Sequence, residues 1–136
     1  MLLTPEMKAR LAAGHDASLD TVENWDLPTL AGAGALRSTA NDMLTFIAAN
    51  LGYTKSPLAP AMAAMLKERR PTGQLGLEMA LGWHIFTTGG KEIIWHNGGT
   101  DGYRSFMGFF FIRIVRLVIA RRREMSIFSP QQNVTP

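Results

Sequence analysis

The chain has 136 residues, of which 46% are hydrophobic and 18% charged, so one globular domain or part of one is the upper limit. Fourteen Lys and Arg against eleven Asp and Glu give a formal charge of +3, and five of the arginines follow residue 110 with a single glutamate. The basic excess therefore belongs to the carboxyl-terminal tail. The absence of cysteine excludes a disulfide framework and thiolate metal sites.

The sequence shows no pattern of a targeting or membrane segment. A helix-start pattern follows the first residues directly, without the basic and apolar regions of a signal peptide. The longest apolar run, from Phe106 to Ala120, contains Arg113 and Arg116, whose charges are unfavourable inside a bilayer. We therefore expect no transmembrane segment and interpret this run as a strand or a distorted terminal helix.

A short helix is the first expected element. Thr4 can cap it, Pro5 suits the first helical position, and Gly14 would end it. The residues from 15 to 28 are polar and rich in turn formers, with Trp25 as the largest apolar anchor. This stretch is expected to form a surface loop.

Two longer helices are expected next. The first would begin at Ser38, a good N-cap, and end at Gly52. Its apolar residues recur at helical spacing: Met43, Phe46, Ile47 and Leu51. The second is predicted from about residue 57 or 59 to Arg70, which precedes a proline. Both patterns are those of amphipathic core helices.

Strands follow the helices. Apolar residues alternate with other residues over 75–86, which predicts one half-buried strand. Gly89-Gly90 would turn the chain, so that residues 91–97 return as its hairpin partner. Counting back from a two-residue turn pairs Trp83 with His96, and the indole would then fix the orientation of the imidazole.

A third strand is predicted over residues 103–112, and it completes an antiparallel meander. The sequence shows no internal repeat and no low-complexity segment. The fold class expected from these elements is α+β, with a meander of three or more strands packed with two or three helices.

The stretch from residue 93 to 106 contains the groups closest to a chemical site. Gly98 and Gly99 remove side chains where a strand edge could offer bare N–H groups to a carbonyl or carboxylate. His96, Asn97 and Thr100 supply polar groups beside them. A Gly-Gly turn between two strands would show much the same pattern, so both interpretations stay open on these residues alone.

Two segments resemble a known family. Residues 95–103, Trp-His-Asn-Gly-Gly-Thr-Asp-Gly-Tyr, resemble the third motif of the serine β-lactamase-like hydrolases: class C β-lactamases, penicillin-binding D-alanyl-D-alanine peptidases and related esterases. That motif is Lys-Thr-Gly in many members and His-x-Gly in a large branch. Residues 31–43 are similar to the family's segment Ala-Gly-Gly-Leu-x-Ser-Thr-Ala-x-Asp-Met. The resemblance covers about residues 5–109, the carboxyl-terminal part of a longer family member.

The resemblance implies a partial β-lactamase/transpeptidase-like fold and acyl transfer on β-lactam, peptide or ester carbonyls. It implies catalytic positions for His96, which stands at the motif's lysine, and for Gly99, whose N–H would form half of an oxyanion hole. The other matching positions would contact substrate: Asn97, Gly98, Thr100 and Tyr103. Asp101 replaces the usual glycine, and its charge would repel an anionic substrate. No cofactor and no metal is implied.

The attacking residue of the family is missing. None of the six serines is followed by a lysine three positions later, and no Tyr-x-Asn motif occurs. We therefore expect one wall of an acyl-transfer site that is inactive alone, with a small acyl compound as substrate. Self-association through an open sheet edge, or a partner that brings the nucleophile, would complete the site. A metal site built from the three histidines has no support in their spacing.

The resemblance ends near Phe109, because the family's Gly-Phe-Asp-Pro turn is replaced by Phe-Phe-Phe-Ile-Arg. We divide the chain into a family portion, residues 1–111, and a divergent basic tail, residues 112–136. A shifted reading frame, a divergent end and an evolved extension would all fit. The alternative function is a non-catalytic interaction module whose tail binds an anionic polymer or membrane, although terminal charge runs are usually solvated and nucleic acid is not favoured. Family members often act in the periplasm or outside the cell, and the localisation stays open.

Overall fold

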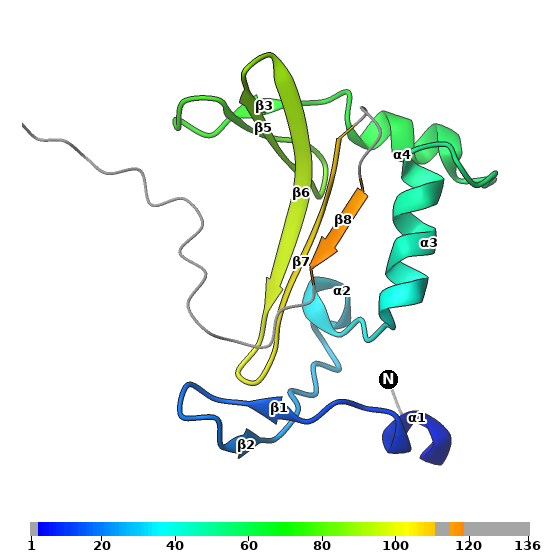
Figure 1. Ribbon diagram of the computed structural model, residues 1–136, viewed down its shortest axis with the longest axis vertical. Coiled ribbons are helices and arrows are strands. Elements are labelled where there is room, and N and C mark those ends of the chain that lie inside the picture. Colours follow the sequence, from blue (N-terminus) through cyan, green and yellow to red (C-terminus); the bar gives the residue numbers. More distant parts are fainter. Residues whose placement is uncertain (1–2, 111–114, 119–136) are drawn as a thin grey trace, which may run out of the picture.

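The computed structural model describes residues 3–110 and 115–118, with the side chains of residues 3–110. An antiparallel six-stranded sheet follows the order β3-β4-β5-β6-β7-β8, so each strand pairs with its neighbour in sequence (Figure 1). The strands are β3 (Arg70–Pro71), β4 (Leu77–Met79), β5 (His84–Thr88), β6 (Lys91–Gly99), β7 (Arg104–Phe109) and β8 (Val115–Val118). The expected α+β class with an antiparallel meander is confirmed.

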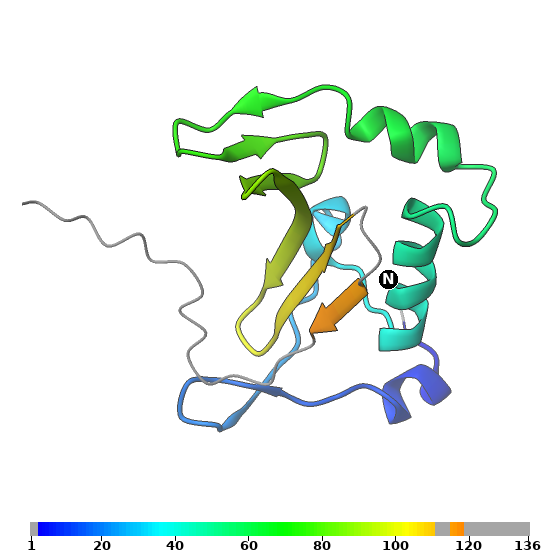
Figure 2. The same ribbon diagram turned by 45° about the horizontal axis from the view of Figure 1, so that its top comes forward.

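The longer helices lie on one side of the meander, and a small second sheet lies at one end of it (Figure 1). The helices are α1 (Pro5–Ala9), α2 (Ala31–Gly34), α3 (Ala40–Asn50) and α4 (Ala59–Met65). α3 runs beside the large sheet, and β1 (Gly14–His15) and β2 (Thr21–Val22) lie next to the turn between β6 and β7 (Figures 1 and 2). Within the described ranges, no helix has the length and apolar character needed to cross a membrane.

The first helix is shorter than predicted. α1 begins after Thr4, whose hydroxyl accepts a hydrogen bond from the Met7 N–H at 3.3 Å. It ends at Ala9, and the predicted end at Gly14 is wrong because that glycine lies in β1. Residues 15, 21 and 22 were expected to lie in a surface loop, and they pair within the small sheet formed by residues 14–15 and 21–22.

The cap of α3 lies one residue after the predicted one. Thr39, and not Ser38, is the N-cap: its hydroxyl accepts a hydrogen bond from the Asp42 N–H at 3.2 Å, and the Asp42 carboxylate accepts one from the Thr39 N–H at 3.4 Å. This reciprocal pair is a capping box. Ser38 lies outside it, and its hydroxyl donates to the Thr39 carbonyl at 3.5 Å.

α4 ends at Met65, short of the predicted end at Arg70. Arg69 shows why, since its guanidinium donates to the Leu66 carbonyl at 2.9 Å and to both carboxylate oxygens of Glu92 at 2.5 and 3.2 Å. These hydrogen bonds lower the pKa of the Glu92 carboxyl. The connection out of α4 is therefore set by a contact with β6, which helix propensity does not encode.

The predicted single strand over 75–86 is divided in two. β4 and β5 pair with each other, because the chain reverses between them at Ala80–Trp83. The Ala80 N–H donates to the Trp83 carbonyl at 2.8 Å, and Gly82 has a φ of +75°, which only glycine adopts readily. Apolar residues continue to alternate with other residues through this turn, so the sequence pattern could not show where the strand breaks.

The β5–β6 hairpin has the predicted register. Gly89-Gly90 forms its two-residue turn with positive φ at both positions, and the ladder runs from Thr88↔Lys91 to His84↔Trp95. The expected pairing of Trp83 with His96 is wrong, since the ladder stops one residue earlier. Trp83 instead turns into the core, where it is 2% exposed.

The core joins the meander to α3. Its buried residues are Ile47, Ala80, Trp83, Ile85, Ile94 and Phe109. The Trp83 ring stacks on Phe46 of α3 at 6.3 Å between centroids and meets Phe109 edge-on at 5.2 Å. Of the residues in the four described helices, Ile47 alone is buried. The sheet therefore supplies most of the core, and the helices keep much apolar surface exposed.

Candidate active site

β6 extends beyond its partner β5 and leaves an open edge. The ladder with β5 ends at His84↔Trp95, whereas the ladder with β7 continues to Gly99↔Arg104. From residue 96 to 99, β6 therefore has β7 on one side and no strand on the other within the part of the chain that the structure describes. These four residues are all exposed. The open edge is the stretch that the sequence singled out.

The directions of the N–H groups on this edge follow from the β6–β7 hairpin. At its turn, the Thr100 N–H donates to the Tyr103 carbonyl at 3.0 Å. Inter-strand hydrogen bonds of an antiparallel pair involve every second residue, so the N–H of Gly98 points to β7. By the same alternation, the N–H groups of Asn97 and Gly99 point to the open edge. Two amide donors two residues apart thus face solvent.

The two glycines leave space that side chains of β7 fill. A Cβ on Gly98 would lie 2.7 Å from the Ser105 hydroxyl oxygen, and one on Gly99 would lie 3.2 Å from Arg104 Nη1. The Arg104 guanidinium also donates to the carbonyls of Thr100 and Tyr103. A hydroxyl and a cation therefore border the edge. The sequence analysis missed both residues, although the register of the third strand could have placed them there.

His96 stands at the start of the open edge beside a second histidine. The rings of His84 and His96 are parallel within 3° and 5.5 Å apart, and the His84 ring lies 4.2 Å from that of Trp95. His84 Nδ1 is buried and has no hydrogen-bond partner among the described residues. Burial disfavours the imidazolium and a charge on His96 would repel it, so the pKa of His84 is lowered. The sequence analysis considered His84 only as one of three histidines whose spacing does not support a metal site.

The lowered pKa of His84 predicts loss of stability in mild acid. Below its ordinary value near 6.5, the unfolded chain takes up a proton that the folded chain resists, so the free energy of unfolding falls as the pH drops through this range. His84→Phe keeps a ring against Trp95 and removes the titrating group. We expect urea unfolding at pH 7.5 and pH 5 to differ less in this variant than in the parent. An unchanged pH dependence in His84→Phe would contradict the assignment.

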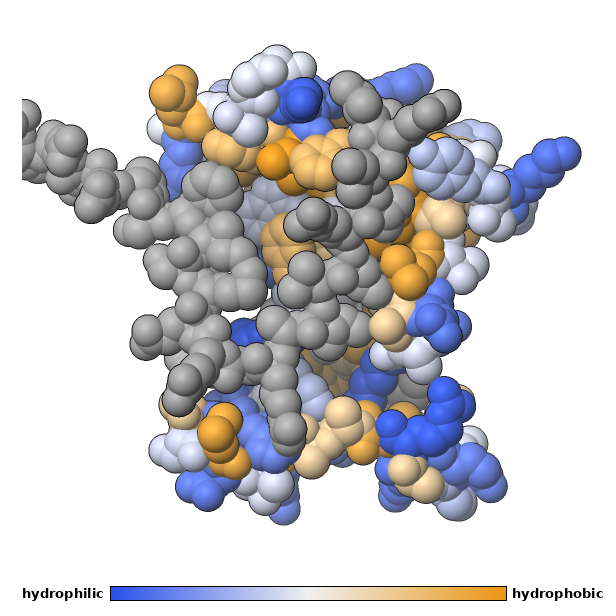
Figure 3. Space-filling model, in the orientation of Figure 1, coloured by the Kyte–Doolittle hydropathy of each residue, from blue (hydrophilic) through white to orange (hydrophobic). Residues whose placement is uncertain are grey.

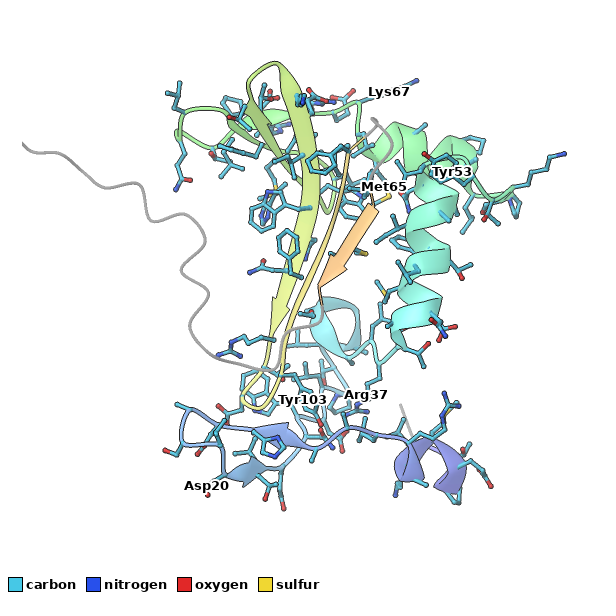
Figure 4. All side chains as sticks on the ribbon, viewed as in Figure 1. Asp20, Arg37, Tyr53, Met65, Lys67 and Tyr103 are labelled. Carbon is cyan, nitrogen blue, oxygen red and sulfur yellow. The ribbon has the colours of Figure 1, made fainter. Side chains whose placement is uncertain are left out.

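Tyr103 takes a different direction from the other predicted site residues. Its hydroxyl donates to the Ala12 carbonyl at 2.6 Å and also contacts Asn24 Oδ1, so it points to the amino-terminal segment (Figure 4). His96, Asn97, Gly98 and Gly99 lie together along the edge, with Thr100 at its end. The structure therefore brings five of the six predicted positions into line, and their roles stay predictions.

A cavity of about 440 Å³ lies between α3, α4 and the sheet. Hydrophobic residues gather beside α3 in this part of the surface (Figure 3). The apolar residues that line the cavity are Leu36, Met43, Phe46, Met65, Trp83 and Met107. Met107 is the cross-strand partner of His96, so the cavity adjoins the strand that carries the open edge. No group of three or more metal-binding side chains comes together within the described residues.

Comparisons with protein families and with curated proteins show which proteins this chain is related to. The family model described as Beta-lactamase matches residues 3–121. The chain belongs to the beta-lactamase family. Among curated proteins, the human "Putative beta-lactamase-like 1" is 30% identical over 111 residues, which make up 74% of this chain and 21% of that protein. This member of the beta-lactamase family thus spans about a fifth of the length of the relative that it matches.

Membership in the beta-lactamase family establishes a relationship to hydrolases and leaves the subfamily open. The two segments that resembled the family in sequence, 31–43 and 95–103, both lie within the matched range. In the structure, the first contains α2 and the start of α3, and the second contains the open edge of β6.

Proposed function

We propose that this chain forms the oxyanion side of an acyl-transfer site of a serine β-lactamase-like hydrolase, which acts on β-lactam, peptide or ester carbonyls. The observation that carries the proposal is the open edge of β6, where the N–H groups of Asn97 and Gly99 point away from β7. Amide hydrogens held rigidly by a sheet stabilise the negative charge that develops on a carbonyl oxygen during acyl transfer. His96 would supply the polar group beside the reacting carbonyl.

The attacking hydroxyl comes from outside this chain in our proposal. The sequence holds no Ser-x-x-Lys, and about four fifths of the human relative lie outside the matched part. The apolar cavity beside the His96 strand and the exposed apolar residues of α3, Leu44 and Phe46, leave surface for a further helix to cover. A second copy docked at the open edge is the other source of a missing element.

The test uses the purified chain labelled with ¹⁵N. It is titrated separately with a penicillin, an N-acyl-D-alanine and a neutral butyrate ester, and the amide signals are followed by NMR. We expect the largest shifts at Asn97 and Gly99, smaller ones at Gly98, and no covalent adduct by mass spectrometry. Which ligand shifts these signals identifies the substrate class.

Two results would overturn parts of the proposal. If no ligand shifts the signals of Asn97 and Gly99, the open edge is not a carbonyl-binding site. If mass spectrometry finds an acyl adduct on one of the serines, the chain carries its own nucleophile. The alternative of an interaction module with a basic tail has no support from the described residues, because residues 121–123 lie outside them.

A further inference from the structure

We propose that Tyr103 is a positioning residue through which residues 12–24 clamp the β6–β7 turn and hold the amide hydrogens of the open edge in place. The sequence analysis placed Tyr103 in contact with substrate, but its hydroxyl is already engaged by the Ala12 carbonyl at 2.6 Å and by the Asn24 side chain. These partners lie 91 and 79 residues away in the sequence. A side chain that ties such distant segments together acts on the backbone of the site.

A second contact joins the same two segments through their backbones. The His15 N–H donates to the Gly102 carbonyl at 3.0 Å. A Cβ on Gly102 would lie 2.7 Å from Gly14 Cα, and one on Gly14 would lie 3.2 Å from Gly102 Cα and 2.9 Å from the Tyr103 ring. β1 and the turn therefore approach so closely that only glycine fits at both positions. Figures 1 and 2 show the two segments side by side from both directions.

The clamp is itself held in shape. Between β1 and β2, the Asp16 carboxylate accepts hydrogen bonds from the N–H groups of Ser18 at 2.8 Å and Asp20 at 3.0 Å. Beyond β2, the Arg37 guanidinium donates to the Trp25 carbonyl at 3.1 Å. The amino-terminal segment is thus fixed at one end to the turn of the site and at the other to the residues before α3.

The clamp matters for the site because the turn ends the open edge. Thr100 and Tyr103 close the turn, and Gly99 directly precedes it. Among the residues that the structure describes, no strand pairs with the other side of β6 at this end, so the turn is the nearest support for the direction of the Gly99 N–H. This consequence for acyl transfer rests on the proposed function, whereas the clamp itself does not.

The test measures amide hydrogen exchange and the Gly99 amide signal in two pairs of variants. Tyr103→Phe removes the hydroxyl, and Tyr53→Phe does the same at a tyrosine that is 66% exposed. Loss of one or two hydrogen bonds should raise exchange at the amides of His15 and Thr100 by about threefold to tenfold and move the Gly99 signal. Tyr53→Phe should change none of these.

The second pair tests the close approach of β1 to the turn. In Gly14→Ala the added methyl would press on the Tyr103 ring at 2.9 Å and on Gly102 Cα at 3.2 Å, so β1 and the turn must move apart although the tyrosine hydroxyl is kept. At the control position, a Cβ on Gly32 meets nothing within 4 Å. We expect Gly14→Ala to raise exchange at Thr100 and to move the Gly99 signal, and Gly32→Ala to do neither.

Two outcomes would overturn the clamp: unchanged exchange at His15 and Thr100 in Tyr103→Phe, or an equal rise at Ile85 and Ile94, which would make the tyrosine a general stability residue. Neither outcome depends on ligand. If no ligand shifts the Asn97 and Gly99 signals but Tyr103→Phe still raises exchange at His15 and Thr100, the proposed function is wrong and the clamp stands.

Discussion

Truncation of Phe109 to alanine is expected to lower the free energy of unfolding by about 3–5 kcal/mol, the range for a fully buried aromatic residue. Phe109 is 0% exposed and meets the Trp83 ring edge-on at 5.2 Å, at the centre of the core that joins the sheet to α3. The loss is a large share of the total for a small domain, for which about 5–15 kcal/mol is typical. Urea unfolding followed by circular dichroism measures it.

Phe106 provides the matched control on the same strand. It is 38% exposed and stacks on Trp95 at 5.7 Å, on the side of β7 away from Phe109. Phe106→Ala should therefore lower the free energy of unfolding by only about 1 kcal/mol, the scale of one exposed aromatic pair. Equal losses in the two variants would mean that the two faces of β7 are buried alike, and the core assignment would be wrong.

The predicted elements matched the structure where a short turn fixes the register, and they failed where the sequence pattern continues through a turn or where a distant contact is made. The Gly89-Gly90 turn set the β5–β6 register because a two-residue loop permits few alternatives. The break at Gly82 was missed because Leu81 and Trp83 continue the alternation through a turn. The end of α4 was also missed, since it depends on the Arg69–Glu92 ion pair across 23 residues.

The sequence motif located the candidate site, but it did not predict the geometry of that site. The sequence predicted a strand over residues 91–97 and a strand edge at Gly98 and Gly99. It could not say which edge of the strand is open, because that depends on where β5 begins. His84 lies beside His96 because it is the first residue of β5 and pairs with Trp95, the residue before His96. The hydroxyl partners of Tyr103 come from residues that sequence patterning assigned to a helix end and a surface loop.

Gly99→Pro is expected to have the largest effect on function. Its N–H points to the open edge and takes no part in the ladder with β7, so proline would remove the proposed oxyanion donor while the strand pairing persists. The chain is combined with a separately expressed Ser-x-x-Lys portion of a beta-lactamase-family domain. In this combination the Gly99→Pro variant should transfer acyl groups about 100–1000-fold more slowly than the parent chain does. The rate is measured with whichever ligand shifts the Asn97 and Gly99 signals.

Gly99→Ala separates loss of the N–H from loss of the glycine. It keeps the amide hydrogen, and its methyl group would approach Arg104 Nη1 at 3.2 Å, the far end of a flexible side chain that can move aside. This variant should retain most of the rate, and both variants should keep parental hydrogen exchange at Gly98, whose N–H points to β7. If alanine slows acyl transfer as much as proline does, the space above Gly99 matters and its amide hydrogen does not. If proline also exposes Gly98 to exchange, strand damage explains the loss, because the ladder and the donor then fail together.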